Sequence, residues 1–186
     1  GTGQYFAVGD NTNITTQSMY GIVDEDTSSA AYSGTNHRTQ LNAQTIDFEQ
    51  TRLEDPTQPL SATNEEIRVR VLGTSAPDYA TQMGWVLDLT SPLSGAEGER
   101  VVSAPYLFDG TLIYQTITPV NIPCQYGGRS MLMQANPSTG GALTIPAFDV
   151  NGDGYFNTND MVDIGGGVMA QVSGVVNEYY GLTEVL

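Results

Sequence analysis

At 186 residues the chain is long enough to bury the core of one ordinary domain. It contains no run of about 18 apolar residues, so no membrane-spanning helix is predicted. Its 21 acidic residues against six Lys plus Arg give a formal net charge of −15, which argues against nucleic acid as a partner. Cys124 and His37 are each the only residue of their type, which excludes an internal disulfide framework and a His-rich zinc site.

The chain opens on GTGQYFAVGD, without an initiator Met and without a basic segment followed by an apolar run. Signal peptides carry those two segments, so none is expected in this stretch. We therefore interpret the sequence as part of a longer precursor, in which any partner of Cys124 lies outside these residues.

Short apolar or alternating runs, separated by Gly, Pro, Asn, Asp and Ser, predict an all-β protein. The expected strands cover 5–8, 19–23, 67–72, 85–89, 112–117 and 131–135. Between 27 and 64 the chain is rich in polar residues, which predicts a long connection with one strand near 45–48. Only a turn after Asp160 and a short piece at 64–66 have helical character. The spacing of the strands is typical of a sandwich, a barrel or a propeller.

Two local patterns give sharper predictions. The run IRVRV at 67–71 alternates, which places three apolar side chains on one face and two Arg on the other and predicts a half-buried strand. The segments 103–109 and 111–116 flank Asp109 and Gly110. Because Asp-Gly between two apolar runs favours a type I′ turn, these segments predict a β-hairpin.

The segment DVNGDGYFNTND at 149–160 has the spacing of a calcium loop. Calcium takes six to eight oxygen ligands at about 2.3 to 2.6 Å, and a twelve-residue loop supplies them from positions 1, 3, 5, 7, 9 and 12. Gly154 stands at position 6, where the sharp turn needs a positive φ. The predicted metal ligands are Asp149, Asn151, Asp153, Tyr155 through its backbone carbonyl, Asn157 and Asp160.

The loop departs from a helix-loop-helix hand in two ways. Position 12 is Asp160 rather than Glu, so the carboxylate has a shorter reach and we expect a modest affinity. The residues before the loop, 143–148, look extended, and those after it, 161–164, are cut short by three glycines. We therefore predict a hand-like calcium site on a β scaffold, with a plain turn rich in Asp and Asn as the alternative.

A loop of this composition with Asp at position 12 is similar to dockerin repeats, which occur as two tandem copies, whereas one copy is present here. An ordered series of motifs instead resembles the C-terminal propeller region of the type IV pilus tip adhesin (PilY) family. The resemblance extends from the first residue to about Gly174. Its motifs are GTGQYF near the start, TQSMYGIVDE at 16–25, the strand end at 70–75 followed by GWVLDL at 84–89, GERVVSAP at 98–105, PCQYGGRSMLMQANPSTGG at 123–141 and FDVNGDG at 148–154.

This resemblance implies that residues 1–186 hold the last few blades of a modified β-propeller, about three or four at some 40 to 50 residues a blade. It implies a secreted, fimbrial cell-adhesion protein that acts outside the cell, at the pilus tip or outer cell surface, in type IV pilus assembly. The implied partners are pilin-like tip subunits, a host or abiotic surface and the remainder of the same propeller. We expect the chain to be stable only when it packs on that remainder or on partner chains.

The resemblance also implies that the calcium loop influences whether pili extend or retract. Asp149, Asn151, Asp153 and Tyr155 match the family's alternating ligands. Asn157 stands at the ninth position, where well-known members have Asp, so we expect weaker binding unless Asp160 compensates.

Two other function classes stay open. A quinoprotein-like propeller enzyme would need stacking tryptophans and a catalytic acid near the ion, but the one tryptophan, Trp85, is far from the loop in sequence. A dockerin-like extracellular assembly module would need a second loop and a cohesin-type partner. We expect no enzymatic activity and no cofactor other than Ca²⁺.

Several residues have structural interpretations. Trp85 begins an apolar run, which favours core packing over stacking on a sugar. The paired acids Glu97 and Glu99 lie in a polar segment, which favours a solvated surface over a glycosidase pair.

Overall fold

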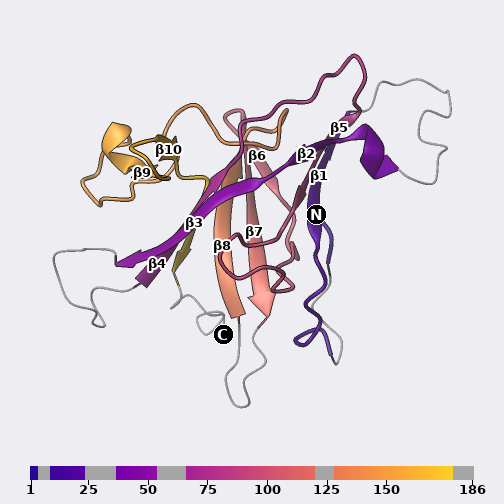
Figure 1. Ribbon diagram of the computed structural model, residues 1–186, viewed down its shortest axis with the longest axis horizontal. Coiled ribbons are helices and arrows are strands. Elements are labelled where there is room, and N and C mark those ends of the chain that lie inside the picture. Colours follow the sequence, from indigo (N-terminus) through magenta and orange to yellow (C-terminus); the bar gives the residue numbers. More distant parts are fainter. Residues whose placement is uncertain (4–8, 24–36, 54–65, 120–127, 178–186) are drawn as a thin grey trace.

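The computed structural model describes residues 1–3, 9–23, 37–53, 66–119 and 128–177. This described part is all-β, with two short 3₁₀ helices, η1 (His37–Gln40) and η2 (Thr158–Asp160). None of its helices is long and apolar enough to cross a membrane. The strands form three sheets; in Figure 1 strands β6, β7 and β8 of the largest sheet lie at the centre, β1 and β5 lie to the right and the β9–β10 hairpin lies at the left.

The largest sheet has six strands, and each strand is antiparallel to its neighbours. In spatial order these are β3 (Ile46–Leu53), β4 (Glu66–Leu72), β11 (Gly174–Asn177), β8 (Gly128–Ala135), β7 (Thr111–Pro119) and β6 (Tyr106–Phe108). Strand β11 lies between β4 and β8, so the last described strand joins two segments that are distant in sequence. The centre of this sheet therefore depends on a strand near the end of the described residues.

The two smaller sheets lie beside the large one. In the three-stranded sheet, β5 (Gly84–Asp88) pairs with β1 (Ser18–Ile22) in antiparallel and with β2 (Asn42–Gln44) in parallel orientation. Only Thr45 separates β2 from β3, so one extended segment passes from the small sheet into the large sheet, as Figure 1 shows. The third sheet is a hairpin of β9 (Met161–Asp163) and β10 (Met169–Gln171).

Most of the predicted strands are confirmed. Strands β1, β4, β5, β7 and β8 coincide with five of the six expected apolar runs, and β3 accounts for the strand expected near 45–48. The expected strand at 5–8 and Cys124 lie outside the described residues. The Asp-Gly hairpin is also confirmed, because Asp109 and Gly110 have φ angles of 45° and 73°, as a type I′ turn requires, between the paired residues Phe108 and Thr111.

The predicted helical turn after Asp160 is wrong. Residues 161–163 form β9 and pair with β10, since Gly165, Gly166 and Gly167 all adopt positive φ and reverse the chain. In the expected helical piece at 64–66, Glu66 instead begins β4, and the other two residues lie outside the described part. The described strands divide into sheets of six, three and two, so the expected four-stranded blades are not seen in this part of the chain.

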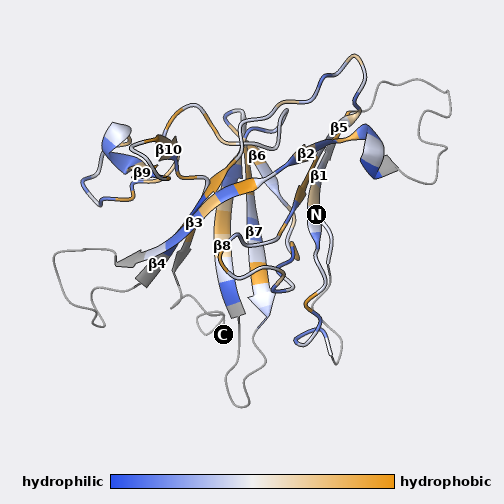
Figure 2. Ribbon diagram, in the orientation of Figure 1, coloured by the Kyte–Doolittle hydropathy of each residue, from blue (hydrophilic) through white to orange (hydrophobic). Residues whose placement is uncertain are grey.

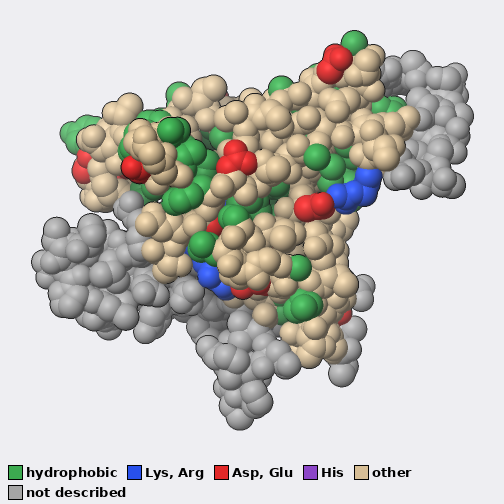
Figure 3. Space-filling model, in the orientation of Figure 1, with side chains coloured by type: hydrophobic (Ala, Val, Ile, Leu, Met, Phe, Trp, Pro, Cys, Tyr) green, Lys and Arg blue, Asp and Glu red, His purple; other side chains and the backbone are tan. Residues whose placement is uncertain are grey.

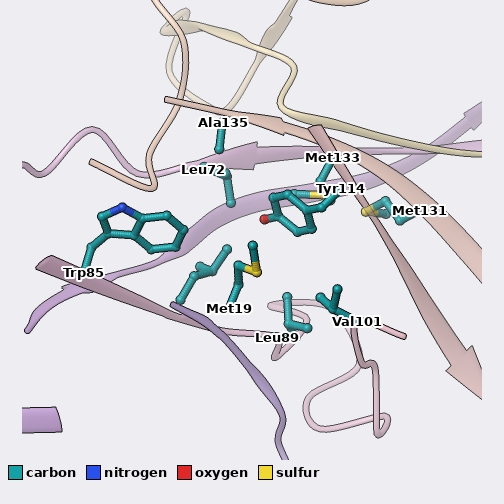
Figure 4. Packing of buried hydrophobic residues seen from close by; sticks show 10 residues of the cluster. Met19, Leu72, Trp85, Leu89, Val101, Tyr114, Met131, Met133 and Ala135 are labelled. Atoms are coloured by element: carbon teal, nitrogen blue, oxygen red, sulfur yellow. The ribbon is translucent and has the colours of Figure 1, made fainter. Parts of the chain in front are cut away.

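A first core cluster lies between the three-stranded and the six-stranded sheets. Figure 4 shows Met19 from β1 and Trp85 from β5 facing Tyr114 from β7 and Met133 from β8. Trp85 is a core residue, as predicted; its indole N–H donates to the Pro137 carbonyl at 2.9 Å. Figure 2 shows hydrophobic residues where the strands cross the centre and hydrophilic residues toward the ends of β3 and β8.

A second core cluster lies on the opposite, outer face of the six-stranded sheet. It joins Val69 and Val71 of β4 to Val150, Val162 and Val172. The last three belong to the segment 148–172, which we call the loop lobe. Packing of valines from both sides attaches the loop lobe to β4.

The prediction that β4 is half-buried is wrong, because its arginine face is buried too. Arg70 is fully buried and lies between two carboxylates, donating to Glu49 at 2.9 Å and 3.1 Å and to Glu99 twice at 2.8 Å. Arg68 donates to the other oxygen of Glu49 at 2.9 Å. The expectation of a solvated Glu99 is therefore also wrong, since this carboxylate is a buried partner of Arg70.

The buried ion pairs form one network. Glu97 bridges Arg68 and Arg129, so three carboxylates meet three guanidinium groups and the network has no net charge. Burial alone would raise the pKa of Glu99, but the charge and hydrogen bonds of Arg70 outweigh burial and hold that pKa below its ordinary value. We call these six residues the charge network.

Candidate calcium site

The loop at 149–160 begins and ends on the second core cluster. Val150, its second residue, and Val162, just beyond its last residue, are both buried against β4. Most residues between them are exposed. No helix of the described part flanks the loop; the single turn η2 lies within it, at its C-terminal end. The predicted absence of a flanking helix pair is therefore confirmed for the described residues.

The Asp149 carboxylate organises the first half of the loop. It accepts backbone N–H groups from Gly152 at 2.7 Å, Asp153 at 3.2 Å and Gly154 at 2.8 Å. Gly152 and Gly154 have φ angles of 73° and 82°, which side chains other than Gly rarely adopt.

The other alternating residues repeat one local pattern. Asn151 accepts from the N–H of Asp153 at 3.0 Å, Asp153 from that of Tyr155 at 2.8 Å, and Asn157 from that of Asn159 at 2.8 Å. Each of these is a turn in which an Asp or Asn side chain accepts from the backbone two residues on. These repeated turns curl the chain, so the alternating Asp and Asn side chains shape the loop through their hydrogen bonds to the backbone.

Asp160 closes the loop. This side chain is buried, and its two oxygens accept from the N–H of Val150 at 2.9 Å and from the N–H of Asn157 at 2.8 Å. Together with the Asn157 side chain, it forms a reciprocal cap on η2. Position 12 therefore ties the second residue of the loop to the ninth, which brings the loop ends together.

The donor set fits calcium in kind and order. Three carboxylates, two amides and one backbone carbonyl are hard oxygen ligands. An oxygen that accepts one N–H keeps a lone pair for a cation. In the described part of the chain, no three Asp, Glu, His or Cys side chains converge closely enough to hold a metal. A bound ion would therefore have to draw Asp149, Asp153 and Asp160 closer together.

The structure also exposes apolar side chains on the loop lobe, which the sequence pattern did not indicate. Tyr155 and Phe156 at the middle of the loop and Val168 and Met169 of the neighbouring hairpin are largely exposed. Figure 3 shows hydrophobic side chains gathered around this lobe. A run of two aromatics inside an otherwise polar loop was the available signal.

The fold and the loop together define a class of protein, namely a β-sheet domain with a hand-like, Asx-rich loop that lacks flanking helices. No protein-family model matches the sequence. The sequence is 30% identical to the type IV pilus biogenesis factor PilY1 of Pseudomonas aeruginosa strain UCBPP-PA14, over 91% of this chain and 15% of that protein. It is also 30% identical to a PilY1 homolog of Xylella fastidiosa, over 76% of this chain and 9% of that protein.

The solved crystal structure of the Pseudomonas aeruginosa PilY1 C-terminal domain has a similar fold. The TM-score is 0.73 at 23% identity, over 95% of this chain and 35% of that chain. The chain belongs to the PilY family and corresponds to part of its C-terminal region. It spans 9% to 15% of the length of the two relatives described above.

Proposed function

We propose that this chain is part of the C-terminal propeller-like domain of a type IV pilus biogenesis factor and acts as a calcium-stabilised adhesin at the pilus tip or outer cell surface. The observation that carries the pilus role is the identity to PilY1 proteins over most of the chain. Its partners would be pilin-like tip subunits, a host or abiotic surface and the rest of its own domain.

The geometry of the loop supports a structural role for calcium. The loop is attached at both ends to valines that pack on β4, and Asp160 closes it from inside. Binding of one divalent cation would offset the mutual repulsion of Asp149, Asp153 and Asp160. We expect the ion to hold the loop lobe on the sheet rather than to drive the opening motion of a sensor hand, which needs a helix pair.

The calcium proposal is tested by thermal unfolding with and without calcium. At a calcium concentration about 100 times Kd, binding stabilises the folded state by about 2.7 kcal/mol, which for this size of domain raises Tm by about 5–10 °C. The expected result is that excess chelator removes this rise. An unchanged Tm in chelator would contradict a structural calcium site.

Two aspartates of the loop lobe make a matched pair for the same measurement. Asp153→Ala removes a predicted ligand and should abolish the calcium-dependent rise in Tm, together with tyrosine-sensitised terbium luminescence from Tyr155. Asp163→Ala is the control, because it removes the same charge from an exposed position of β9 outside the loop. Among the hydrogen bonds described, the Asp163 carboxylate accepts only from the N–H of Gly165. This variant should keep both calcium signals. Equal calcium responses in the two variants would mean that the ligands are wrongly assigned.

The pilus proposal needs the natural host. Deletion of the gene should reduce surface pili and surface attachment, and the native gene should restore both. Restoration by the Asp153→Ala gene at normal protein level would separate the pilus role from calcium. A deletion strain with normal pili and attachment would overturn the pilus role.

A further inference from the structure

The first half of the loop at 149–160 contains Asn151-Gly152, the only Asn-Gly dipeptide in the sequence. The backbone nitrogen of the residue after an Asn can attack the Asn side chain and close a cyclic imide. Glycine in that place favours the closure, because it has no side chain to crowd the ring and its backbone is free to turn. Asn151 and Gly152 are both exposed, and a Cβ on Gly152 would meet nothing within 4 Å, so the site has room for the ring.

The nitrogen that would attack is engaged while the loop is closed. The N–H of Gly152 donates to the Asp149 carboxylate at 2.7 Å. The same carboxylate accepts from the N–H of Asp153 at 3.2 Å and of Gly154 at 2.8 Å, so it also holds the backbone that follows. Ring closure requires the Gly152 nitrogen to lose its proton and to turn toward the side chain of Asn151. Its hydrogen bond to Asp149 must therefore break first.

The amide that would be attacked is held as well. Its oxygen accepts from the N–H of Asp153 at 3.0 Å, and its nitrogen donates to the Asp153 carboxylate at 3.1 Å. These bonds direct the Asn151 side chain to the residue two positions on. In the predicted ligand set the same amide oxygen also binds calcium, which would restrain it further. Both reacting groups are therefore free to meet only when the loop opens.

We propose that Asn151 is a deamidation site, which the calcium-bound loop protects and the open loop exposes. The inference rests on the proposed calcium site. In the open loop the Gly152 nitrogen forms a bond to the side-chain carbonyl carbon of Asn151, and the bond from that carbon to Nδ2 breaks. Nδ2 leaves as ammonia and takes the proton that Gly152 loses. Water then opens the cyclic imide at one of its two carbonyl carbons, so the reaction needs no other reactant.

The two products change the loop in opposite ways. Attack of water on the former side-chain carbon restores the ordinary backbone and leaves an aspartate at position 151. Together with Asp149, Asp153 and Asp160 this gives the loop a fourth carboxylate, and a higher ligand charge strengthens calcium binding. Attack on the main-chain carbon instead gives isoaspartate, whose backbone runs through the side chain and has one extra carbon. That extra carbon displaces the alternating ligands from one another and should prevent calcium binding.

Peptide mapping by mass spectrometry of the full-length natural protein tests the inference. The protein is incubated at neutral pH in heavy-oxygen water, with excess chelator or with calcium at about 100 times Kd, and the acidic products at Asn151 are followed with time. Oxygen taken from the heavy water marks the products that form during the incubation. At this calcium concentration the calcium-free population falls about 100-fold, so Asn151 should deamidate at least about tenfold more slowly than in chelator.

Asn13 is a matched control within the same chain. It is exposed, and its side-chain oxygen accepts from the N–H of Thr15, two residues on, at 3.0 Å, as that of Asn151 accepts from Asp153. Ile14 follows it, and a side chain branched at Cβ crowds the ring that Gly152 leaves open. In chelator, Asn151 should therefore deamidate at least about tenfold faster than Asn13.

Two results would overturn the inference. One is deamidation of Asn151 in chelator no faster than that of Asn13, a result that leaves the calcium proposal standing if calcium still raises Tm. The other is an equal rate at Asn151 with calcium and with chelator. In that case the Tm of the same samples separates the two failures: a Tm that responds to calcium refutes only the protection, whereas an unchanged Tm refutes the calcium site too.

The variant Asn151→Asp gives the aspartate product alone. It should bind calcium at least about threefold more tightly than the native protein, because one more ligand carries a charge. Calcium titration of Tm in the full-length protein measures this difference. Weaker binding by Asn151→Asp would overturn the effect assigned to this product.

Discussion

At the scale of single residues, the loop shows what spacing alone can predict. The sequence pattern correctly indicates where the chain turns, because Asp149, Asn151 and Asp153 each accept backbone N–H groups a few residues on. It does not indicate that Asp160 is buried, since burial depends on Val150 and Val162 packing on a strand that lies far away in sequence. The calcium assignment itself stays a prediction.

Tyr114 packs its ring in the first core cluster but buries a polar hydroxyl there. Its hydroxyl is buried and has no hydrogen-bond partner among the residues that the structure describes, and burial raises the pKa of this group above its ordinary value. Because an unpaired buried hydroxyl destabilises the folded state, Tyr114→Phe should raise the free energy of unfolding by about 1 kcal/mol. Urea denaturation measures this change.

The control for Tyr114→Phe is Tyr79→Phe. The Tyr79 hydroxyl donates to the carbonyl of Ser138, so its removal should lower the free energy of unfolding by about 0.5–1.5 kcal/mol. Opposite signs for the two variants are expected. A loss of stability in Tyr114→Phe would show that its hydroxyl has a partner in solution.

At the scale of elements, β4 connects the two halves of the interior. Val69 and Val71 hold the loop lobe on one face, and Arg68 and Arg70 join the charge network on the other. Alternation in the sequence predicts the strand and its two faces. The alternation does not predict that the arginine face is buried. A buried arginine needs carboxylate partners, and Glu49 and Glu99 come from segments that only the tertiary fold brings to β4.

The charge network gives an element-scale prediction. Arg70→Met leaves Glu49 and Glu99 buried without their main partner, so the free energy of unfolding should fall by about 3–5 kcal/mol in urea denaturation. Arg38→Met is the matched control, since Arg38 pairs with Asp88 where both side chains are almost half exposed, and it should cost less than about 1 kcal/mol. Similar losses in the two variants would refute a special role for the buried pairs.

The remaining elements differ in how far apart in sequence their paired residues lie. The Asp109-Gly110 hairpin was predictable because the turn is local. The parallel pairing of β2 with β5 and the insertion of β11 between β4 and β8 were not, because both join segments distant in sequence. The sequence pattern predicts a helical turn where β9 lies, because the strand that pairs with it, β10, follows only after three glycines.

At the scale of the whole molecule, half of the basic residues lie in the interior, whereas most acidic residues lie outside the charge network. The charge network takes up three of the six basic residues, Arg68, Arg70 and Arg129, while the protein keeps its net charge of −15. Figure 3 accordingly shows few basic side chains on the face in view. The outer surface is therefore more uniformly acidic than the composition alone would suggest, which favours solubility and repels other anionic surfaces.

This division predicts a loss of stability in acid. Glu99 and Asp88 both have pKa values below their ordinary range, in each case because hydrogen bonds and charge from an arginine outweigh the effect of burial. A carboxylate with a depressed pKa contributes stability above its ordinary pKa and loses it as pH falls through the folded value. Tm should therefore drop steeply below about pH 4.

Glu99→Gln isolates the contribution of the network to that acid transition. The variant should be less stable near neutral pH, and its Tm should fall less between pH 5 and pH 3 than that of the native chain, in thermal scans at constant salt. Asp163→Asn, at an exposed carboxylate of β9, should keep the native slope. An unchanged slope in Glu99→Gln would mean that Glu99 does not take up a proton in this range.

The burial of the arginines also determines where trypsin can cleave the folded protein. All six basic residues are arginine, so trypsin has no lysine to cut after. Arg68, Arg70, Arg100 and Arg129 are buried or largely covered, and an extended strand held in a sheet cannot enter a protease cleft without local opening. Cleavage after Arg70 or Arg100 would therefore report opening of the core, whereas a cut after Arg38, at the exposed end of η1, would leave it closed. The buried arginines therefore make the survival of this domain against a trypsin-like protease depend on how seldom its sheet opens.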